Sequence, residues 1–213
     1  MGAASTRAGS GPGRRARAAA TRAHSRPGGG PPLCTPRLVL RDFEPGDAAL
    51  LERAAQDRRR AGSLPLGGRA LAVAQRVAAR GRPRAAKARR SFELAVVLKR
   101  GAKLIGACDL ARSGPRRADI GYVLSRRHWG YGYGTEVAVA LVDFAFEVLG
   151  LAEVTAIVAV ENERSRRVLD KAGLRWDGLM RRHTRFAGRW WDCHRYIIER
   201  ATWSQGRGLR RPA

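Results

Sequence analysis

Hydrophobic residues alternate with polar residues in several short stretches of the chain, and in others they recur every three or four positions. Alternation is typical of strands, and the longer spacing is typical of helices. Strands are expected at 37–43, 91–99, 103–111, 116–125 and 153–160, with a closing hairpin made by 174–186 and 190–200. Helices are expected at 44–57, 69–80, 135–150 and 162–173. This order predicts a mixed α/β domain with an antiparallel meander followed by a βαβ crossover.

Three alternating glycines stand between a predicted strand and a predicted helix. The stretch 127–136 reads RHWGYGYGTE, and it follows a strand whose Ile120, Tyr122 and Leu124 share one face. Glycine permits positive φ, and a helix that begins directly after such a turn points its free N–H groups at an anion. The spacing is not that of a P-loop, which needs G-x-x-x-x-G-K-[ST]. Taken alone, the loop is better explained as a simple connecting turn.

The two ends of the chain differ in composition from its middle. Residues 1–33 consist of Ala, Gly, Pro, Arg, Ser and Thr with little else, and the first acidic residue is Asp42. Such a segment buries too little apolar surface to offset the entropy lost on ordering. We therefore expect a disordered extension at 1–33, one folded domain at 34–204 and a flexible basic tail at 205–213.

The sequence argues against a membrane protein, a disulfide-stabilised protein and a metal-binding protein. No apolar stretch is long enough to cross a bilayer, and no signal-peptide core is present. Cys34, Cys108 and Cys193 are odd in number and widely spaced, without the paired spacing of metal ligands. We expect a cytoplasmic protein with reduced thiols and no metal site.

The net charge of +24 has two readings. Most basic residues are Arg, and Ala, Gly and Pro are abundant as well, so a bias toward codons rich in G and C explains much of the charge. A positive surface also attracts acidic partners such as nucleic acid or ribosomes. We favour a solvated basic surface, with a weak nucleic-acid or ribosome association left open.

Four separated segments resemble one family, the GCN5-related N-acetyltransferases (GNAT), and within it the ribosomal-protein N-terminal acetyltransferase (RimJ/RimL-like) group. The segments are TPRLVLRDF, ADIGYVLSRRHWGYGYGTE, ENERSRRVLDKAGL and GRWWDCHRYII, in the family's order, and together they span roughly residues 35–200. The resemblance implies the GNAT fold, a single α/β domain whose mixed, mostly antiparallel twisted sheet has about seven strands flanked by helices. It also implies an acetyl-CoA co-substrate and no metal.

The resemblance assigns donor-binding roles to particular residues. The glycine loop would hold the CoA pyrophosphate at the helix N-terminus, and the end of the preceding strand would offer main-chain groups to the pantetheine arm and the thioester oxygen. Asn162 and Ser165 match positions that contact pantetheine and approach the sulfur. An N-cap role for Asn162 is equally compatible with its position. The expected donor-binding residues are Val123, Leu124, Arg127, Trp129, Gly130, Tyr131, Gly132, Tyr133, Gly134, Thr135, Asn162 and Ser165.

Three residues are candidates for catalysis. Asp119 lies where several members of the family place a carboxylate base. A carboxyl group has too low an ordinary pKa to deprotonate an ammonium directly, so burial or a water chain would have to assist it. Ser165 is the candidate for giving or relaying a proton to the thiolate, because its position matches one that approaches the sulfur. The tyrosine that is the frequent proton donor in the family is missing from this helix. Glu136 is a second carboxylate, although capping and dipole compensation suit its place in the first helical turn.

The acceptor is an amine whose identity the resemblance leaves open, either a protein N-terminus or a small molecule. His183 and His194 are read as structural or surface groups rather than catalytic ones. A homodimer is left open. The alternative to an enzyme is a non-catalytic protein of the same fold, or an Arg-rich protein that binds nucleic acid or ribosomes through its basic surface.

Overall fold

The computed structural model describes residues 32–44, 46–47, 90–186 and 188–208. The helix expected at 69–80 and most of the one expected at 44–57 lie outside these residues, as does the extension up to residue 31. The described strands are β1 (Leu33–Cys34), β2 (Leu38–Asp42), β3 (Ser91–Leu98), β4 (Lys103–Arg112), β5 (Arg117–Leu124), β6 (Glu153–Ala159), β7 (Arg175–Phe186) and β8 (Arg189–Glu199). The described α-helices are α3 (Tyr133–Asp143), α4 (Glu163–Lys171) and α5 (Arg200–Gly208).

The strands form one sheet in the order β1-β2-β3-β4-β5-β6-β8-β7. Every neighbouring pair is antiparallel except β5 and β6, which run parallel and are joined by the crossover through α3. The eight-stranded sheet confirms the expected mixed, mostly antiparallel architecture. The additional strand is β1, only two residues long, which a hydrophobic pattern is too short to reveal.

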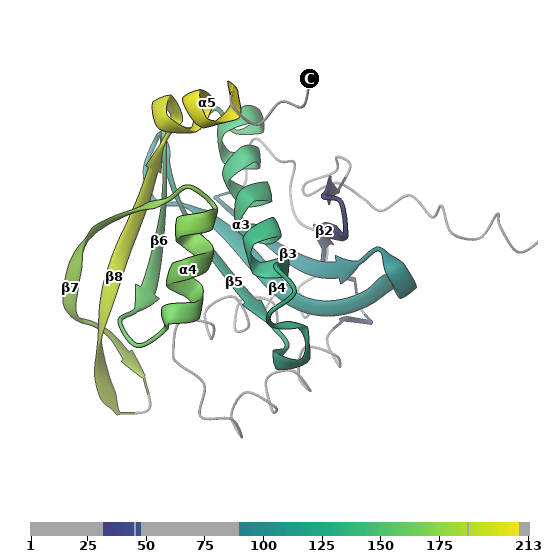
Figure 1. Ribbon diagram of the computed structural model, residues 1–213, viewed down its shortest axis with the longest axis horizontal. Helices are drawn as coiled ribbons and strands as arrows, with labels where there is room; N and C mark the ends of the chain where they lie inside the picture. The colour runs from purple at the N-terminus through teal and green to yellow at the C-terminus, as the bar shows by residue number, and fades with distance from the viewer. Residues whose placement is uncertain (1–31, 45, 48–89, 187, 209–213) are drawn as a thin grey trace, which may run out of the picture.

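Helices α3 and α4 cover one face of the sheet (Figure 1). Their apolar side chains meet even-numbered residues of β5 and β6 in the main core, including Ile120, Leu124, Val154 and Val158. The odd-numbered residues of β5 lie on the opposite face, because successive side chains of a strand point to opposite sides. Val123, for example, packs there beside Ala107 in a separate small cluster.

Two helical segments differ from their expected form. The helix after the glycines begins at Tyr133, two residues earlier than expected, and a π-helical turn at Phe144–Val148 forms its end. The tail expected to be flexible from residue 205 is helical as far as Gly208 within α5. Trp203 explains the difference, since its ring packs 5.2 Å from that of Phe146 and its indole N–H donates to Asp143 at 2.7 Å. The amino-acid composition of the tail does not reveal such a tertiary contact.

Candidate active site

The parallel strands β5 and β6 pair only at their beginnings. Their register covers residues 117–119 of β5 and 153–155 of β6. Beyond this point both strands continue, β5 to Leu124 and β6 to Ala159, without pairing to each other. Figure 1 shows the two strands running apart below α3, with α4 in front of the widening space between them. This divergence leaves one edge of β5 with backbone groups that no strand partner satisfies.

Backbone direction along β5 alternates from one residue to the next. Ser125 donates its N–H to Ile105 of β4 at 2.8 Å, so Val123 also turns its backbone groups toward β4. Leu124 turns its groups the other way, toward the opening, and its carbonyl accepts the indole N–H of Trp129 at 2.9 Å. Of the two strand-end residues expected to bind the pantetheine arm, Leu124 is therefore the one whose main chain faces the opening.

The glycine loop lies at the end of β5 and leads directly into α3. Gly130 and Gly132 adopt φ of 85° and 80°, in the left-handed region that favours glycine. Gly132 is the N-cap of α3, and no side chain caps the helix there. The N–H groups of Tyr133, Gly134 and Thr135, in the first helical turn, have no intrahelical acceptor. The loop can therefore present several donors and the positive end of the helix dipole to an anion.

Gly134 is favoured by close packing rather than by its backbone angles. A Cβ atom at this position would lie 3.3 Å from the ring of Tyr122 and 3.4 Å from Val168 of α4. The start of α3 thus approaches both β5 and α4 closely, which places the glycine loop beside the opening in the sheet.

Trp129 connects the loop to its surroundings. Its indole N–H binds Leu124 at the end of β5, and the guanidinium of Arg164 from α4 lies 5.6 Å above its ring. Tyr131 is more exposed and stacks on Tyr133 with 5.8 Å between ring centres. Arg127 lies in a short 3₁₀ turn at Arg126–His128 and is exposed beside the loop. The loop therefore suits a phosphate group, because the backbone N–H groups of the first turn of α3 can donate to it and the cationic side chain of Arg127 lies nearby.

Ser165 lies against a tyrosine that was not among the expected site residues. The side chain of Asn162 accepts the Ser165 N–H at 3.2 Å, which confirms the N-cap role for Asn162. The hydroxyl groups of Ser165 and Tyr122 are 2.8 Å apart. Burial raises the pKa of Tyr122 to about 12, although its hydrogen bond with Ser165 acts in the opposite direction. The phenol thus keeps its proton at neutral pH and is joined to the serine on α4.

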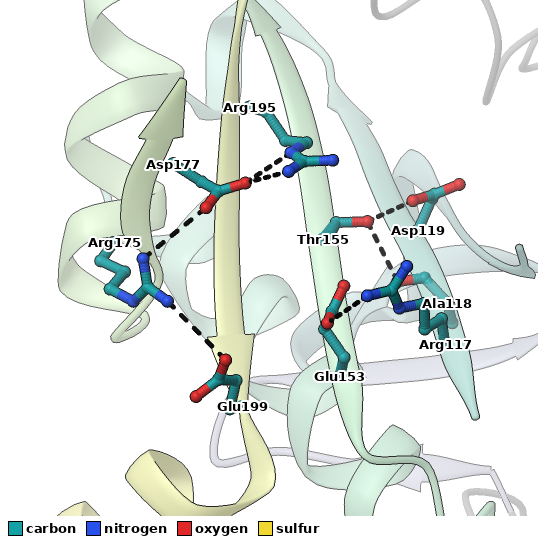
Figure 2. Close-up of polar contacts among 9 residues, drawn as sticks. All are labelled: Arg117, Ala118, Asp119, Glu153, Thr155, Arg175, Asp177, Arg195 and Glu199. Atoms are coloured by element: carbon teal, nitrogen blue, oxygen red, sulfur yellow. Dashed lines mark hydrogen bonds and ion pairs between the residues drawn. The ribbon is translucent and has the colours of Figure 1, made fainter. Parts of the chain in front are cut away.

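Asp119 lies on the other face of the sheet, at the last paired position before β5 and β6 separate (Figure 2). The Thr155 hydroxyl of β6 donates to its carboxylate and also lies 3.4 Å from the carbonyl of Ala118. Arg117 pairs with Glu153 on the same face, two residues nearer the beginning of each strand.

The opposite charges on β7 and β8 in Figure 2 form a separate group of ion pairs. Asp177 binds Arg195, and Arg175 lies 3.7 Å from both Asp177 and Glu199. The arginines are exposed, so these pairs contribute little to stability. We regard them as surface interactions outside the candidate active site.

Glu136 is engaged by residues of the N-terminal strands. The Arg37 side chain donates to its carboxylate at 2.7 Å, and the Arg37 backbone N–H and the Thr35 hydroxyl donate to it as well. Burial would raise the pKa of Glu136, but the hydrogen bonds from Thr35 and Arg37 together with the guanidinium charge outweigh it and lower the pKa. A carboxylate held in this way is a poor general base, which supports the structural reading of Glu136.

His183 and His194 lie on β7 and β8, the two strands of the closing hairpin. His194 accepts the indole N–H of Trp176 at 2.8 Å, and His183 is exposed on β7. All three cysteines are free, Cys34 exposed and the other two buried. In the described part of the chain, no group of three His, Cys, Asp or Glu side chains could hold a metal ion.

Sequence reasoning missed Tyr122 and Arg37. Tyr122 shares a face with Ile120 and Leu124, and a tyrosine on an apolar face carries a hydroxyl that needs a partner. The tyrosine hydroxyl on an apolar face therefore indicates a hydrogen-bond partner, but only the packing of α4 shows that this partner is Ser165. Arg37 precedes an apolar strand in the segment TPRL, and nothing in its local pattern distinguishes it from the chain's many other arginines.

Comparison with known proteins agrees with this arrangement. Residues 37–175 match the family model described as the acetyltransferase (GNAT) domain. The chain therefore belongs to the GNAT acetyltransferase family. Within the described residues, no helix is long and apolar enough to cross a membrane.

Relatives by sequence are similar over shorter segments. The uncharacterized N-acetyltransferase YoaA of Bacillus subtilis is 37% identical over 83 residues, which are 39% of this chain and 47% of YoaA. The probable N-acetyltransferase YjcK of the same organism is 39% identical over 93 residues, 42% of this chain and 51% of YjcK. The chain spans about half the length of these curated relatives.

Solved structures share the fold over a larger part of the chain. RimJ of Mycobacterium smegmatis in complex with CoA-disulfide superposes with a TM-score of 0.64 at 24% identity, covering 81% of this chain and 90% of RimJ. A mutant form of the spermidine/spermine N-acetyltransferase SpeG of Vibrio cholerae superposes with a TM-score of 0.63 at 19% identity, covering 80% and 98%. At these identities, the likeness shows the fold alone.

Proposed function

We propose that this protein is an N-acetyltransferase that moves the acetyl group of acetyl-CoA to a primary amine. The observation that carries the proposal is the position of the glycine loop. Its uncapped helix N-terminus follows the end of β5 and lies beside the unpaired part of this strand, beyond the point where β5 and β6 separate. A long donor with an anionic end and a reactive thioester end can occupy both features at once. Membership in the GNAT family supports the same reading.

The donor would lie along the end of β5. The N–H groups of Tyr133, Gly134 and Thr135 would hold the pyrophosphate, with Arg127 at the rim. The open edge at Leu124 would pair with the pantetheine amides as an added strand does. Val123 stays in the proposed binding region because it directly precedes Leu124. Asn162 caps the start of α4 and so helps to position Ser165.

The reaction forms a C–N bond between the amine and the acetyl carbon and breaks the C–S bond of the thioester. The amine must lose a proton, and the departing thiolate gains one. We assign the first proton to Asp119, acting through water. We assign the second transfer to Ser165, whose hydroxyl is hydrogen-bonded to the protonated phenol of Tyr122.

The two proton-handling groups lie on opposite faces of the sheet. Asp119 belongs to the face away from the helices, whereas Tyr122 and Ser165 belong to the α3–α4 face. Strands β5 and β6 stop pairing next to Asp119. An amine arriving from the Asp119 face would meet a thioester whose sulfur points toward Ser165, so attack and departure take place on different sides.

The acceptor we propose is a protein N-terminus or a small-molecule amine. Solved structures with this fold include a putative ribosomal-protein-serine acetyltransferase and a spermidine/spermine N-acetyltransferase, both of Vibrio cholerae, so the fold is compatible with protein and small-molecule acceptors.

The proposal is tested by following thiol release from acetyl-CoA. The purified protein is incubated with N-terminal peptides, polyamines and other small primary amines, and acetylated products are identified by mass spectrometry. We expect acetyl-CoA to raise the melting temperature and at least one amine to stimulate thiol release. If acetyl-CoA neither binds nor reacts, the enzyme reading fails. Salt-sensitive binding of nucleic acid in its place would support the Arg-rich binding protein.

Replacing Tyr122 with phenylalanine is expected to lower kcat by about tenfold to a hundredfold. The ring and its packing remain, but Ser165 loses its hydroxyl partner, so protonation of the thiolate slows. KM for acetyl-CoA should change little. Ser165→Ala should lower kcat similarly, and the double variant should be no slower than the slower single variant, because both residues serve one proton transfer.

Tyr196→Phe is the matched control, since it removes a hydroxyl from a buried tyrosine of β8. Its kcat should equal that of the wild type. A Tyr122→Phe variant with wild-type kcat would exclude the proposed relay.

A further inference from the structure

We propose that Arg37 is a positioning residue that holds the glycine loop in the shape that binds the donor pyrophosphate. This inference rests on the proposed function and adds to it a residue far from the reacting atoms. Arg37 lies just before β2, 94 residues before Tyr131 and 99 before Glu136 in the chain. Neither the GNAT loop motif nor the candidate catalytic groups include it.

Arg37 contacts the loop and the helix behind it at the same time. Its Nη1 donates to the carbonyl of Tyr131 at 2.8 Å, within the loop. Its Nε and Nη2 both lie 2.7 Å from Oε2 of Glu136, in the first turn of α3. One planar guanidinium thus contacts both the Tyr131 carbonyl, which precedes Gly132 in the chain, and the Glu136 carboxylate, which follows it. The rigid fork of arginine suits this task better than a single ammonium does.

The loop needs such a tether because of its glycines. Gly130 and Gly132 flank Tyr131, and a peptide between glycines reorients at little steric cost. In a planar trans peptide, the carbonyl and the following N–H point in opposite directions. By holding the Tyr131 carbonyl toward its guanidinium, Arg37 therefore directs the Gly132 N–H away from the Arg37 side chain. The direction of a loop donor is thus set by a side chain from another part of the fold.

Arg37 is itself well anchored. Its carbonyl accepts the Lys99 N–H at 2.9 Å, and its backbone N–H donates to Glu136 at 2.8 Å. Its guanidinium also lies 4.6 Å above the ring of Tyr133. The carboxylate of Glu136 is mostly buried and its pKa is lowered, so the ion pair persists at neutral pH. Because the Arg37 backbone is itself hydrogen-bonded, its side chain connects the glycine loop to a fixed part of the sheet edge.

The decisive experiment compares two acetyl donors in the full-length protein. Acetyl-CoA carries the pyrophosphate, whereas acetyl-pantetheine has the same thioester and no phosphate. For Arg37→Ala, we expect KM for acetyl-CoA to rise about tenfold with kcat within about twofold of wild type. Kinetics with acetyl-pantetheine should be unchanged. A residue needed only for folding would affect both donors equally.

Arg175→Ala is the matched control. Like Arg37, Arg175 is an exposed arginine beside a mostly buried carboxylate: the side-chain exposures are 61% and 18% for Arg175 and Asp177, and 49% and 11% for Arg37 and Glu136. It lies on the edge strand β7, away from the loop. We expect wild-type kinetics with both donors.

Two further variants keep the test decisive if Arg37→Ala folds poorly. Arg37→Lys retains the charge but cannot reach both partners with a rigid fork, so KM for acetyl-CoA should rise to a value between wild type and Arg37→Ala. Glu136→Gln weakens the pair from the other side and should raise KM for acetyl-CoA only. The double variant Arg37→Ala/Glu136→Gln should be no worse than Arg37→Ala.

Each outcome separates the inference from the proposed function. A wild-type protein that neither binds nor uses acetyl-CoA overturns the proposed function. Wild-type activity combined with unchanged KM for acetyl-CoA in the Arg37 and Glu136 variants overturns the inference alone. An equal loss with both donors also overturns it, because the defect would then lie outside the pyrophosphate loop.

Discussion

Replacing Gly132 with valine is expected to weaken acetyl-CoA binding by about a hundredfold or more. Gly132 has φ of 80°, and an L-residue in this region costs roughly 1–2 kcal/mol, with a further penalty for a β-branched side chain. A Cβ atom would also lie 3.4 Å from Nη2 of Arg37. The loop must change shape to relieve the backbone strain, and its N–H groups then lose their common direction. Calorimetric titration of acetyl-CoA measures the loss directly.

Gly150→Val is the control for this substitution. Gly150 follows the π-helical turn with φ of 67°, and a Cβ atom there meets nothing within 4 Å. The backbone penalty is similar, but the site is remote from the loop. We expect lower stability together with wild-type affinity for acetyl-CoA. If Gly132→Val also keeps wild-type affinity, the glycine loop is only a connecting turn.

Replacing Asp119 with asparagine is expected to lower kcat by about a hundredfold or more while KM for acetyl-CoA stays near its wild-type value. Asparagine preserves the size of the side chain and can still accept the Thr155 hydroxyl. It cannot take a proton from the amine or from a bridging water. Steady-state kinetics at saturating acetyl-CoA, with an amine found in the thiol-release screen, provide the measurement.

Glu153→Gln is the matched carboxylate variant, since Glu153 lies on the same face and pairs with Arg117. It should leave kcat unchanged. A kcat for Asp119→Asn within about threefold of wild type would reduce Asp119 to a structural partner of Thr155. The proton acceptor would then have to be sought elsewhere.

The elements with strong hydrophobic periodicity were predicted well. The strand before the glycines was expected at 116–125 and runs from Arg117 to Leu124, and the N-cap role of Asn162 was also recognised. Both features depend on residues a few positions apart. The α5 helix was missed because it depends on the contact of Trp203 with Phe146, which the local composition does not encode.

The candidate site was predicted in part for the same reason. The loop was recognised because strand, glycines and helix are adjacent in the chain. The sequence does not distinguish Val123 from Leu124, because the pattern of side chains does not say which backbone groups face an unpaired edge. From the sequence, Glu136 is a candidate base, whereas in the structure Arg37 and Thr35 hold its carboxylate.

The order of the elements and the position of the glycine loop between a strand and a helix are properties of the sequence by itself, because they follow from local periodicity and from the conformational freedom of glycine. Only the tertiary structure decided which groups meet at the opening in the sheet. Tyr122 reaches Ser165 across 43 residues, and Arg37 reaches Tyr131 across 94. Such contacts depend on how the strands diverge and how α3 and α4 pack, which no local pattern contains.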